Sequence, residues 1–330
     1  MLHAQTKELL SHSKNLLAFS AGIDSTALFF ILLQNNITFD IAIVDYGVRK
    51  QSKEEVAYAQ ELASKNSSAC FVHNAQKIEK NFEAKAREIR YNFFENIIKE
   101  HNYDTLLTAH HLGDRFEWFL MQFCKGAGCI ELSGMQEVET RIDYQLIRPL
   151  LHLDKQELLH YLHTNNIKYF QDSSNKEEKY KRNIFRHKHA EPLLKEYLGG
   201  IKKSFTYLDE DKQTLINHSN IKKLNQLAYF TSTTTRSDIY TIDKYLKSLN
   251  HLMTAHERAL LKQDINLVVG RKYIISKEKN YIFIAPYIPK HAGANKELRE
   301  KLRVLKIEPK LRAYLFEDLE ALELVSLLLE

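Results

Sequence analysis

Cysteine and long apolar runs are both scarce in this sequence. It has three cysteines in 330 residues, Cys70, Cys124 and Cys129, and none of them belongs to a Cys-x-x-Cys pair. This argues against a zinc ribbon, an iron–sulfur cluster and a disulfide framework, so we expect free thiols. The longest apolar run, 26–33, is far shorter than the roughly 20 residues that cross a bilayer. Residues 1–6 lack a signal-peptide core, so we expect a cytoplasmic protein without membrane contact.

A Walker-type phosphate loop is also missing, because no Gly-Lys pair occurs in the sequence. A different loop stands between an apolar run at 15–19 and a helix-like run at 26–34. When a short strand turns through small residues into a helix, backbone N–H groups converge and the helix dipole adds positive charge. We expect this loop to bind a di- or triphosphate. Its residues are Ser20, Ala21, Gly22, Ile23, Asp24 and Ser25.

Positive charge is in modest excess, and part of it is concentrated in one segment. The formal net charge is +5 and the sequence pI is about 8.8. Residues 176–189 form a basic stripe that contains Tyr180 and Phe185. The stripe is either a solvated face or a polyanion-binding surface, because Lys and Arg neutralise phosphates and aromatic rings stack on bases. Charge alone favours neither interpretation.

The first part of the chain alternates short β-rich runs with amphipathic stretches, the pattern of a parallel sheet covered by helices. We predict strands at 15–19, 39–45, 69–73 and 104–108, and helices at 25–34, 52–65 and 82–101. Another helix, at 155–164, begins with a capping box, because Glu157 stands three residues after Asp154. The predicted fold class is α/β, with a doubly wound, mostly parallel sheet.

The composition changes after Gly199-Gly200 to helical patterns rich in Lys, Leu and Asn. We therefore predict two domains, 1–200 and 201–330. The second is expected to be smaller and largely helical. It should contain a β-hairpin, with strands at 266–275 and 281–285, and a closing helix at 314–330.

Three candidate functional loops follow predicted strands, after Phe19, Val44 and Thr108. In doubly wound sheets ligands bind beyond the carboxyl ends of the strands, so these loops can meet in one crevice. In the third loop His110 and His111 precede a helix on which Asp114 and Glu117 share a face. A transition-metal hydrolase is one interpretation. Beside a nucleotide loop we favour Mg²⁺ and ATP, because Mg²⁺ prefers oxygen ligands and takes some of them from the phosphates of the substrate.

Six motifs occur in one order along residues 15–190, and together they resemble the tRNA(Ile)-lysidine synthetase family of the PP-loop ATP pyrophosphatase superfamily. The resemblance implies a PP-loop, adenine nucleotide α-hydrolase-like fold. It also implies an activity, in which ATP adenylates the wobble cytidine of a CAU-anticodon isoleucine tRNA and free L-lysine then displaces AMP to form lysidine. The motifs are the loop at 20–25, Asn81–Tyr91, His110–Glu117, Lys125–Gly128 with Leu132–Met135, Arg148–Leu150, and Asp172–Asn175 with Arg182–Arg186.

The resemblance also implies residue roles. Asp24, His110, Asp114 and Glu117 would be catalytic, and Asp24 with Glu117 would hold Mg²⁺. Arg87 would join the loop in binding ATP, since a guanidinium binds oxyanions in bidentate fashion. The substrate-binding set would be Asp114, Glu117, Asp172, Ser174, Asn175 and Arg182.

Structural roles remain alternatives for some of these residues. Arg87 and Arg182 could be surface ion pairs, and the 172–175 loop could cap the following helix. His111 is expected to orient its loop by hydrogen bonding rather than to take part in chemistry. Residues 1–200 would form the catalytic domain and 201–330 the tRNA-binding or accessory domain. Candidate tRNA contacts are Lys202, Lys203, Lys222, Lys223, Arg271 and Lys272.

The sequence departs from the family pattern in three places. Ala21 stands where the loop usually has glycine, so the backbone there must tolerate a Cβ. Residues 45–49 lack the usual histidines, and Arg115 and Trp118 are unusual around the two carboxylates. A tRNA thiolase and a noncatalytic tRNA-binding protein remain alternatives. The oligomeric state, a homodimer included, and the tRNA identity elements stay open.

Overall fold

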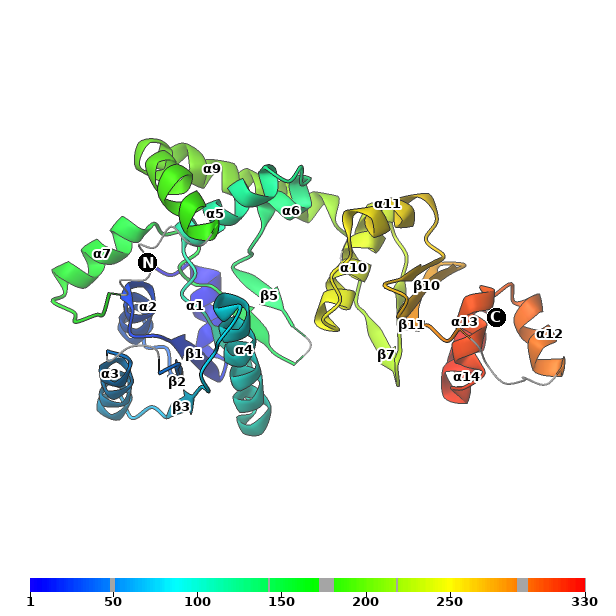
Figure 1. The fold of residues 1–330 in the computed structure, drawn as a ribbon, viewed down its shortest axis with the longest axis horizontal. Helices are drawn as coiled ribbons and strands as arrows, with labels where there is room; N and C mark the ends of the chain where they lie inside the picture. Colours follow the sequence, from blue (N-terminus) through cyan, green and yellow to red (C-terminus); the bar gives the residue numbers. More distant parts are fainter. Residues whose placement is uncertain (48–50, 142, 172–180, 218, 290–295, 330) are drawn as a thin grey trace. The chain divides into compact units, whose positions relative to one another are not determined.

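Two compact units, Met1–Asp209 and Glu210–Glu330, make up the chain (Figure 1). The computed structural model describes residues 1–47, 51–141, 143–171, 181–217, 219–289 and 296–329. The division falls within helix α9 (Glu191–Leu215), the helix that also contains the sequence-based boundary after residue 200. The roles that the sequence suggested for the two parts remain predictions.

The first unit is built on a six-stranded sheet with the order β3-β2-β1-β4-β6-β5. All neighbouring strands are parallel except β5, which runs antiparallel to β6 at the edge. The predicted α/β fold class is therefore confirmed. The strands are β1 (Asn15–Phe19), β2 (Phe39–Asp45), β3 (Cys70–Asn74), β4 (Thr105–Leu107), β5 (Val138–Thr140) and β6 (Gln145–Ile147).

Helices connect the parallel strands and cover the sheet. α2 is apolar without interruption over 27–33, and this part packs with β1 in one hydrophobic cluster, because a helix segment that is buried all round has no polar face. The predicted capping box of α7 is present, with Asp154 and Glu157 each accepting from the other's backbone N–H at 2.7 Å. The helices are α1 (Ala4–Ser11), α2 (Ile23–Gln34), α3 (Ser52–Lys65), α4 (Phe82–His101), α5 (Leu112–Phe123), α6 (Cys129–Ser133), α7 (Lys155–Thr164), α8 (Lys181–Phe185) and the π-helix η2 (Arg186–Ala190), followed by α9.

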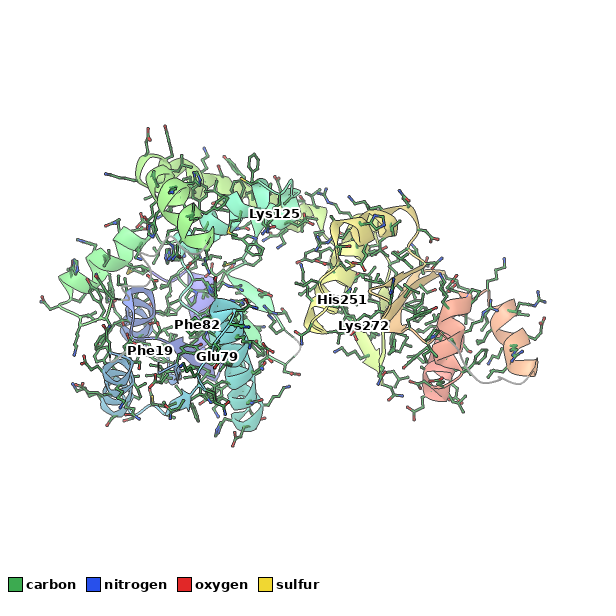
Figure 2. All side chains as sticks on the ribbon, in the orientation of Figure 1. Phe19, Glu79, Phe82, Lys125, His251 and Lys272 are labelled. Atoms are coloured by element: carbon green, nitrogen blue, oxygen red, sulfur yellow. The ribbon has the colours of Figure 1, made fainter. Side chains whose placement is uncertain are left out.

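The strand order places a topological switch point between β1 and β4. The chain runs outward from β1 to β2 and β3, then returns to the other side of β1 with β4. Loops that follow β1 and β4 therefore lie at the same edge of the sheet, on either side of a crevice suited to a ligand. Phe19, the last residue of β1, marks where the first of these loops begins (Figure 2).

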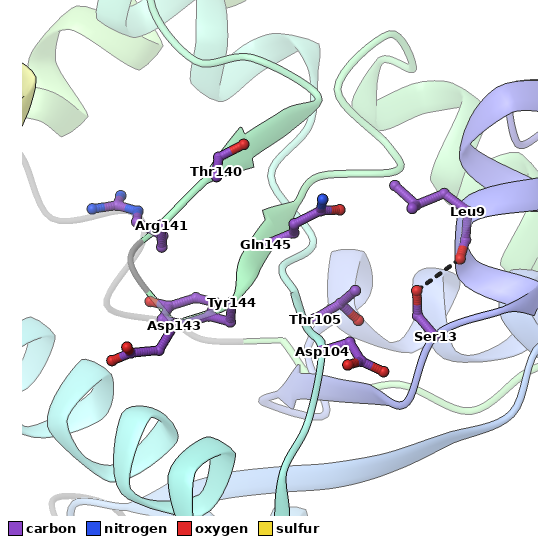
Figure 3. Close-up of a pocket in the computed structure, with 9 residues that line it drawn as sticks. All are labelled: Leu9, Ser13, Asp104, Thr105, Thr140, Arg141, Asp143, Tyr144 and Gln145. Atoms are coloured by element: carbon purple, nitrogen blue, oxygen red, sulfur yellow. Dashed lines mark hydrogen bonds between the residues drawn. The ribbon is translucent and has the colours of Figure 1, made fainter. Parts of the chain in front are cut away.

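A hollow of about 420 Å³ lies at the other end of the same sheet, where β4 and β6 begin (Figure 3). Its walls include the first residues of β4 and β6, Thr105 and Gln145, whereas the phosphate loop follows the carboxyl end of β1. The hollow is thus separate from the switch point. It is lined by Leu9, Ser13, Asp104, Thr105, Thr140, Arg141, Asp143, Tyr144 and Gln145.

The second unit contains a five-stranded antiparallel sheet with the order β7-β8-β11-β10-β9. The predicted hairpin is present as β10 and β11, but the sheet is larger than that hairpin. The strands are β7 (Lys222–Leu224), β8 (Leu227–Thr231), β9 (Leu267–Val269), β10 (Tyr273–Glu278) and β11 (Tyr281–Pro286). The helices are α10 (Thr235–Ser248), α11 (Ala255–Gln263), α12 (Lys296–Val304), α13 (Pro309–Leu315) and α14 (Leu319–Leu329).

Two sequence-based expectations for this unit were wrong in detail. The predicted strand at 266–275 is two strands, because the chain turns at Gly270 and Arg271, which have φ of +58° and +56°. The predicted closing helix is split into α13 and α14. Asp318 interrupts it by accepting the Ala321 N–H at 3.0 Å and the Tyr314 hydroxyl at 2.7 Å, which starts a new helix. None of the helices in the described part of the chain is both long and apolar enough to cross a membrane.

Candidate functional site

The turn between β1 and α2 is held by two serine side chains. Ser20 and Ser25 bring their hydroxyl oxygens to 3.0 Å, and the Ser20 N–H donates to Ser25 Oγ at 3.2 Å. Gly22 is the N-cap of α2 and provides no side-chain cap, so within the described chain no capping side chain occupies the first-turn N–H groups of α2. Free N–H groups at a helix start attract anions. The predicted phosphate-binding residues thus lie together at one point.

Ala21 occupies the one position in this loop that favours glycine. Its φ is +56°, in the left-handed region, and its side chain is fully buried. An L-residue there costs roughly 1–2 kcal/mol of backbone strain. The conformation is held from outside, because Ala21 O accepts the Phe170 N–H at 2.9 Å and Gly22 forms a β-bridge with Phe170. The Cβ is therefore tolerated, at a cost in strain.

Asp24 lies in the first turn of α2, with its carboxylate near His111. Its Oδ1 is buried and has no hydrogen-bond partner among the described residues, while Oδ2 lies 3.9 Å from His111 Nε2. Burial raises the pKa of Asp24 and the nearby His111 opposes that rise. A buried carboxylate oxygen without a donor is suited to a cation.

His111 caps α5 and links two acidic residues. Its ring Nδ1 accepts the Gly113 backbone N–H at 2.9 Å. The backbone N–H of His111 donates to Asp114 Oδ2 at 3.1 Å, which completes a capping box. Because Nδ1 is an acceptor, the ring proton lies on Nε2. That nitrogen is 3.7 Å from Asp114 and 3.9 Å from Asp24. The orienting role expected for His111 agrees with these contacts.

His110 lies in the same loop and is kept neutral. Its Nδ1 is 2.9 Å from the hydroxyl of Thr108. Burial lowers the pKa of His110 to about 4, although Asp114 acts in the opposite direction. Arg87 is close enough to contribute to this lowering, while its guanidinium stacks on Tyr91 at 4.6 Å. At pH 7 the His110 imidazole is therefore neutral.

Asp114 and Glu117 are bound by two arginines. Arg182 contacts Asp114 at 2.7 Å and Glu117 at 3.0 Å, and Arg186 contacts Glu117 at 2.5 Å and Asp114 at 3.5 Å. Burial by itself would raise the pKa of Asp114, but His111, His110 and both arginines outweigh it, so that pKa lies below its usual value. Both oxygens of the Glu117 carboxylate accept from guanidinium groups.

These contacts connect segments that are distant in sequence. The pair Arg182 and Arg186 comes from α8 and η2, at the i,i+4 spacing that places both on one helical face. Sequence reasoning assigned no role to Arg186, although that spacing was the signal available. In the basic stripe these two arginines face carboxylates rather than only solvent. Asp172, Ser174, Asn175 and residues 176–180 lie outside the described residues.

Arg115, one of the departures from the family pattern, is a structural anchor beside this site. Its side chain is buried, pairs with Asp209 and donates to Ser133 O at 2.8 and 3.1 Å. It also lies over the Phe205 ring at 4.3 Å. Arg115 therefore joins α5 to α9, while Glu117 on the same helix joins α5 to α8 and η2.

Comparison with known proteins agrees with this geometry. A family model described as a PP-loop domain matches residues 1–193. A tRNA(Ile)-lysidine synthase of Helicobacter pylori (strain ATCC 700392 / 26695) is 40% identical over 94% of this chain and 92% of its own length. The protein of that name from Wolinella succinogenes is 43% identical over 96% and 97%, and one from Campylobacter jejuni (strain RM1221) is 42% identical over 93% and 94%.

A likeness among solved structures concerns the fold alone. A U34-tRNA thiolase from Methanococcus maripaludis, with a 4Fe-4S cluster, superposes with a TM-score of 0.52 at 16% identity. It covers 65% of this chain and 76% of that one. The match supports the PP-loop α/β architecture, while the sequence relatives extend over both units. On the domain match and on relatives at 40–43% identity over almost the whole chain, the protein belongs to the tRNA(Ile)-lysidine synthase family of PP-loop proteins.

Proposed function

We propose that this chain ligates free lysine to C2 of the wobble cytidine in CAU-anticodon isoleucine tRNA. In the first step cytidine O2 attacks the α-phosphorus of ATP and pyrophosphate leaves. In the second step the lysine ε-nitrogen attacks C2, AMP leaves and a proton is released. The observation that carries the proposal is the shared position of Asp24, His111 and Asp114 beside the phosphate loop, with distances of 3.9 and 3.7 Å through the His111 ring.

The phosphate loop would serve the first step. Backbone N–H groups from Ala21 to Ser25 and the Ser20 hydroxyl can donate to the phosphates as negative charge develops on the leaving pyrophosphate. The Ser20 N–H and the Ser25 hydroxyl would first have to leave their bonds within the loop. Asp24 fits the role of a Mg²⁺ ligand, because its Oδ1 is buried without a donor among the described residues. A bound Mg²⁺ would supply further charge stabilisation there. We propose Arg87 as an additional contact to ATP.

Glu117 fits a metal less well than Asp24 does. Both of its oxygens accept from Arg182 and Arg186, and its side chain is 2% exposed. As a metal ligand it would have to exchange at least one arginine. We therefore assign the Mg²⁺ role to Asp24 first and retain Glu117 as the second candidate.

The acidic pair on α5 would serve the second step. A carboxylate is the natural partner of an ammonium group, and we propose Asp114, followed by Glu117, as the groups that hold the lysine ε-amine. Because two arginines neutralise this pair, the ammonium would have to share or replace Arg182, whose side chain is the more exposed at 36% against 17% for Arg186. Arg182 could then contact the phosphate or the lysine carboxylate.

The lysine amine must lose a proton before it can attack, since its free pKa is about 10.4. His110 is our candidate for contacting the reacting base. Its imidazole is neutral at pH 7, and Thr108 occupies only the Nδ1 side of the ring, so the Nε2 side is available for that contact. A pKa of about 4 makes His110 a weak acceptor for the ammonium proton. His111 is assigned to positioning, because both of its nitrogens are engaged at the helix start.

The second unit is proposed to hold the tRNA. Lys222, Lys223, Arg271 and Lys272 are exposed on its surface, and Lys272 is labelled in Figure 2. In the first unit Lys203 is exposed as well, whereas Lys202 is partly buried and pairs with Glu157 at 2.7 Å. Lys202 is for that reason the weakest of these candidates.

Pyrophosphate release tests the proposal against a noncatalytic tRNA-binding protein. The native chain should release pyrophosphate only when ATP and the isoleucine tRNA are both present, and Asp24→Asn should abolish the release. Absence of release with the correct tRNA would reject an enzymatic role. A Cys124→Ser/Cys129→Ser variant distinguishes thiolation, because turnover should be retained if lysine is the nucleophile and lost if sulfur is transferred.

A further inference from the structure

Three metal-ligating side chains meet at a place that the proposed reaction does not use. His3 immediately precedes α1, Glu137 immediately precedes β5, and His152 lies two residues before the N-cap of α7. Elements α1, β5 and α7 are labelled in Figure 1 and all belong to the first unit. Residues 134 positions apart are thus brought into contact.

The three side chains are close enough to share one ion. His3 Nδ1 lies 2.7 Å from Glu137 Oε2, and the rings of His3 and His152 stack with centroids 3.9 Å apart. One nitrogen or oxygen from each residue can be chosen so that all three lie within 4.8 Å of one another. His152 Nδ1 is buried and has no hydrogen-bond partner within the described residues.

The surroundings fix two of the three ligands. Glu137 uses its other oxygen, Oε1, to accept from the Thr6 hydroxyl, which leaves Oε2 directed at His3. His152 is held through Nε2, which lies 3.0 Å from Met1 O. With Nε2 donating to that carbonyl, Nδ1 carries the lone pair, as in histidines that bind metals and donate through their second nitrogen.

We propose that His3, Glu137 and His152 bind one divalent transition-metal ion of the zinc class. Two imidazoles and one carboxylate form a donor set that suits Zn²⁺, Co²⁺ or Ni²⁺, with ligand distances near 2.0–2.2 Å for zinc, and it does not suit Mg²⁺, which prefers oxygen ligands. The ion would lie in the plane of each ring, so His3 turns out of the stack when it binds. His3 can do so because its side chain is 52% exposed. Water would complete the tetrahedron.

The ion would act as a structural clamp that fastens the N-terminal segment to the sheet edge and to the start of α7. This inference does not depend on the proposed reaction, since none of the three residues belongs to the phosphate loop or to the carboxylate–arginine cluster. Metal that binds only the folded chain also stabilises it by mass action.

The test uses the full chain without an affinity tag, titrated with Co²⁺ while visible absorption is recorded, and with Zn²⁺ in a calorimeter. The native chain should bind one equivalent and gain thermal stability with Zn²⁺. His3→Ala, Glu137→Gln and His152→Ala should each weaken binding by at least about tenfold. His160→Ala, which removes an exposed histidine on α7, is the matched control and should change binding less than twofold.

Several outcomes would overturn the proposal. These are no stoichiometric binding by the native chain, equal binding by His152→Ala and the native chain, and displacement of Co²⁺ by an equal concentration of Mg²⁺. A sulfur-to-cobalt absorption band would also overturn it, because the metal would then lie on a cysteine. Circular dichroism and metal-free thermal unfolding of each variant separate loss of the ligand from loss of the fold.

Discussion

Buried charges serve different purposes in the two units. In the first unit Glu117 pairs with arginines 65 and 69 residues away, so the charges join remote elements at the sheet edge. In the second unit Asp238 accepts from Ser232 and Thr233 nearby, which arranges the start of α10, and its one remote charged contact among the described residues is Lys277 at 3.9 Å. Burying a charge cluster costs desolvation, and clusters of perturbed carboxylates gather at functional sites more often than elsewhere, whereas a carboxylate that accepts from nearby N–H groups can simply cap a helix. The contrast supports the proposal that the chemistry takes place in the first unit.

The largest expected effect comes from Asp24→Asn. Loss of this carboxylate should lower tRNA-dependent turnover by at least about a hundredfold, a loss typical of removing one electrostatic stabiliser of the transition state. Stability should not fall. Because burial raises the pKa of Asp24, its ionised form destabilises the fold once the pH exceeds the unfolded value, and Asn removes that penalty.

Pyrophosphate release and urea unfolding at pH 7 measure the two effects of Asp24→Asn separately. A variant that loses stability in step with activity would make Asp24 a structural residue. The contrast between the units would then fail at its most informative position.

Glu117→Gln sharpens the comparison by removing a long-range charge. The change leaves Asp114 as the remaining carboxylate that contacts both arginines. It should destabilise the chain by roughly 2–3 kcal/mol, less than for a fully buried pair, because Asp114 still contacts Arg182 at 2.7 Å and the Arg182 side chain is 36% exposed. Turnover should fall as well. Urea unfolding followed by fluorescence gives the stability change.

Glu278→Gln is the control for Glu117→Gln. Glu278 is buried in the second unit and accepts from Ser276 and from the Glu308 N–H, both at 2.6 Å, and its pKa is raised by burial. Neither of those two contacts involves a cation that the substitution would leave unpaired. Glu278→Gln should therefore lower the free energy of unfolding by less than Glu117→Gln does, and it should leave turnover unchanged. An equal loss of unfolding free energy in both variants would contradict the difference between the buried charges of the two units.

Gly113→Ala should disturb the site through His111. A Cβ at Gly113 would lie 2.5 Å from His111 Cε1, so the imidazole must leave its present position near Asp24 and Asp114. We expect roughly a tenfold loss of turnover, on the scale of a misplaced positioning group.

Gly200→Ala is the matched control on α9, since no described atom lies within 4 Å of the added Cβ. It should stabilise the helix by about 0.5–1 kcal/mol and leave activity unchanged. Steady-state kinetics of both variants measures the effect. Full activity in Gly113→Ala would show that His111 does not position the site.

Ala21→Gly should have the smallest effect. Glycine relieves the strain at φ of +56° but adds entropy to the unfolded chain, so the net gain in stability should be about 0.5 kcal/mol. ATP affinity should stay within about twofold, because the backbone conformation is already the one that glycine would adopt. The urea midpoint and nucleotide titration measure both. A large rise in ATP affinity would mean that the Cβ obstructs the phosphates.

Local structure was predictable where the signal was local. The bounds of β1, β2, α3, α4 and α7 agree with the sequence-based predictions, because strand alternation, helical periodicity and the Asp154–Glu157 box all act within a few residues. β7 was missed, since Lys222 and Lys223 give an edge strand little apolar pattern, and β8 was missed although its sequence is largely apolar.

Long-range features could not be read from the sequence. The strand order and the two arginines on Glu117 depend on contacts across many residues, which periodicity does not encode. The convergence of the loops after β1 and β4 was predictable only through the general rule for parallel sheets. The predicted roles of Asp24, His110, Asp114, Glu117 and Arg182 remain predictions that the variants above can test.

Transfer of labelled lysine to tRNA tests the central claim most directly. The native chain is incubated with ATP, radiolabelled lysine and either isoleucine tRNA with a CAU anticodon or methionine tRNA with the same anticodon. The account predicts ATP-dependent label on the isoleucine tRNA, little on the methionine tRNA, and none with Asp24→Asn. Label on neither tRNA, or incorporation that does not require ATP, would contradict it.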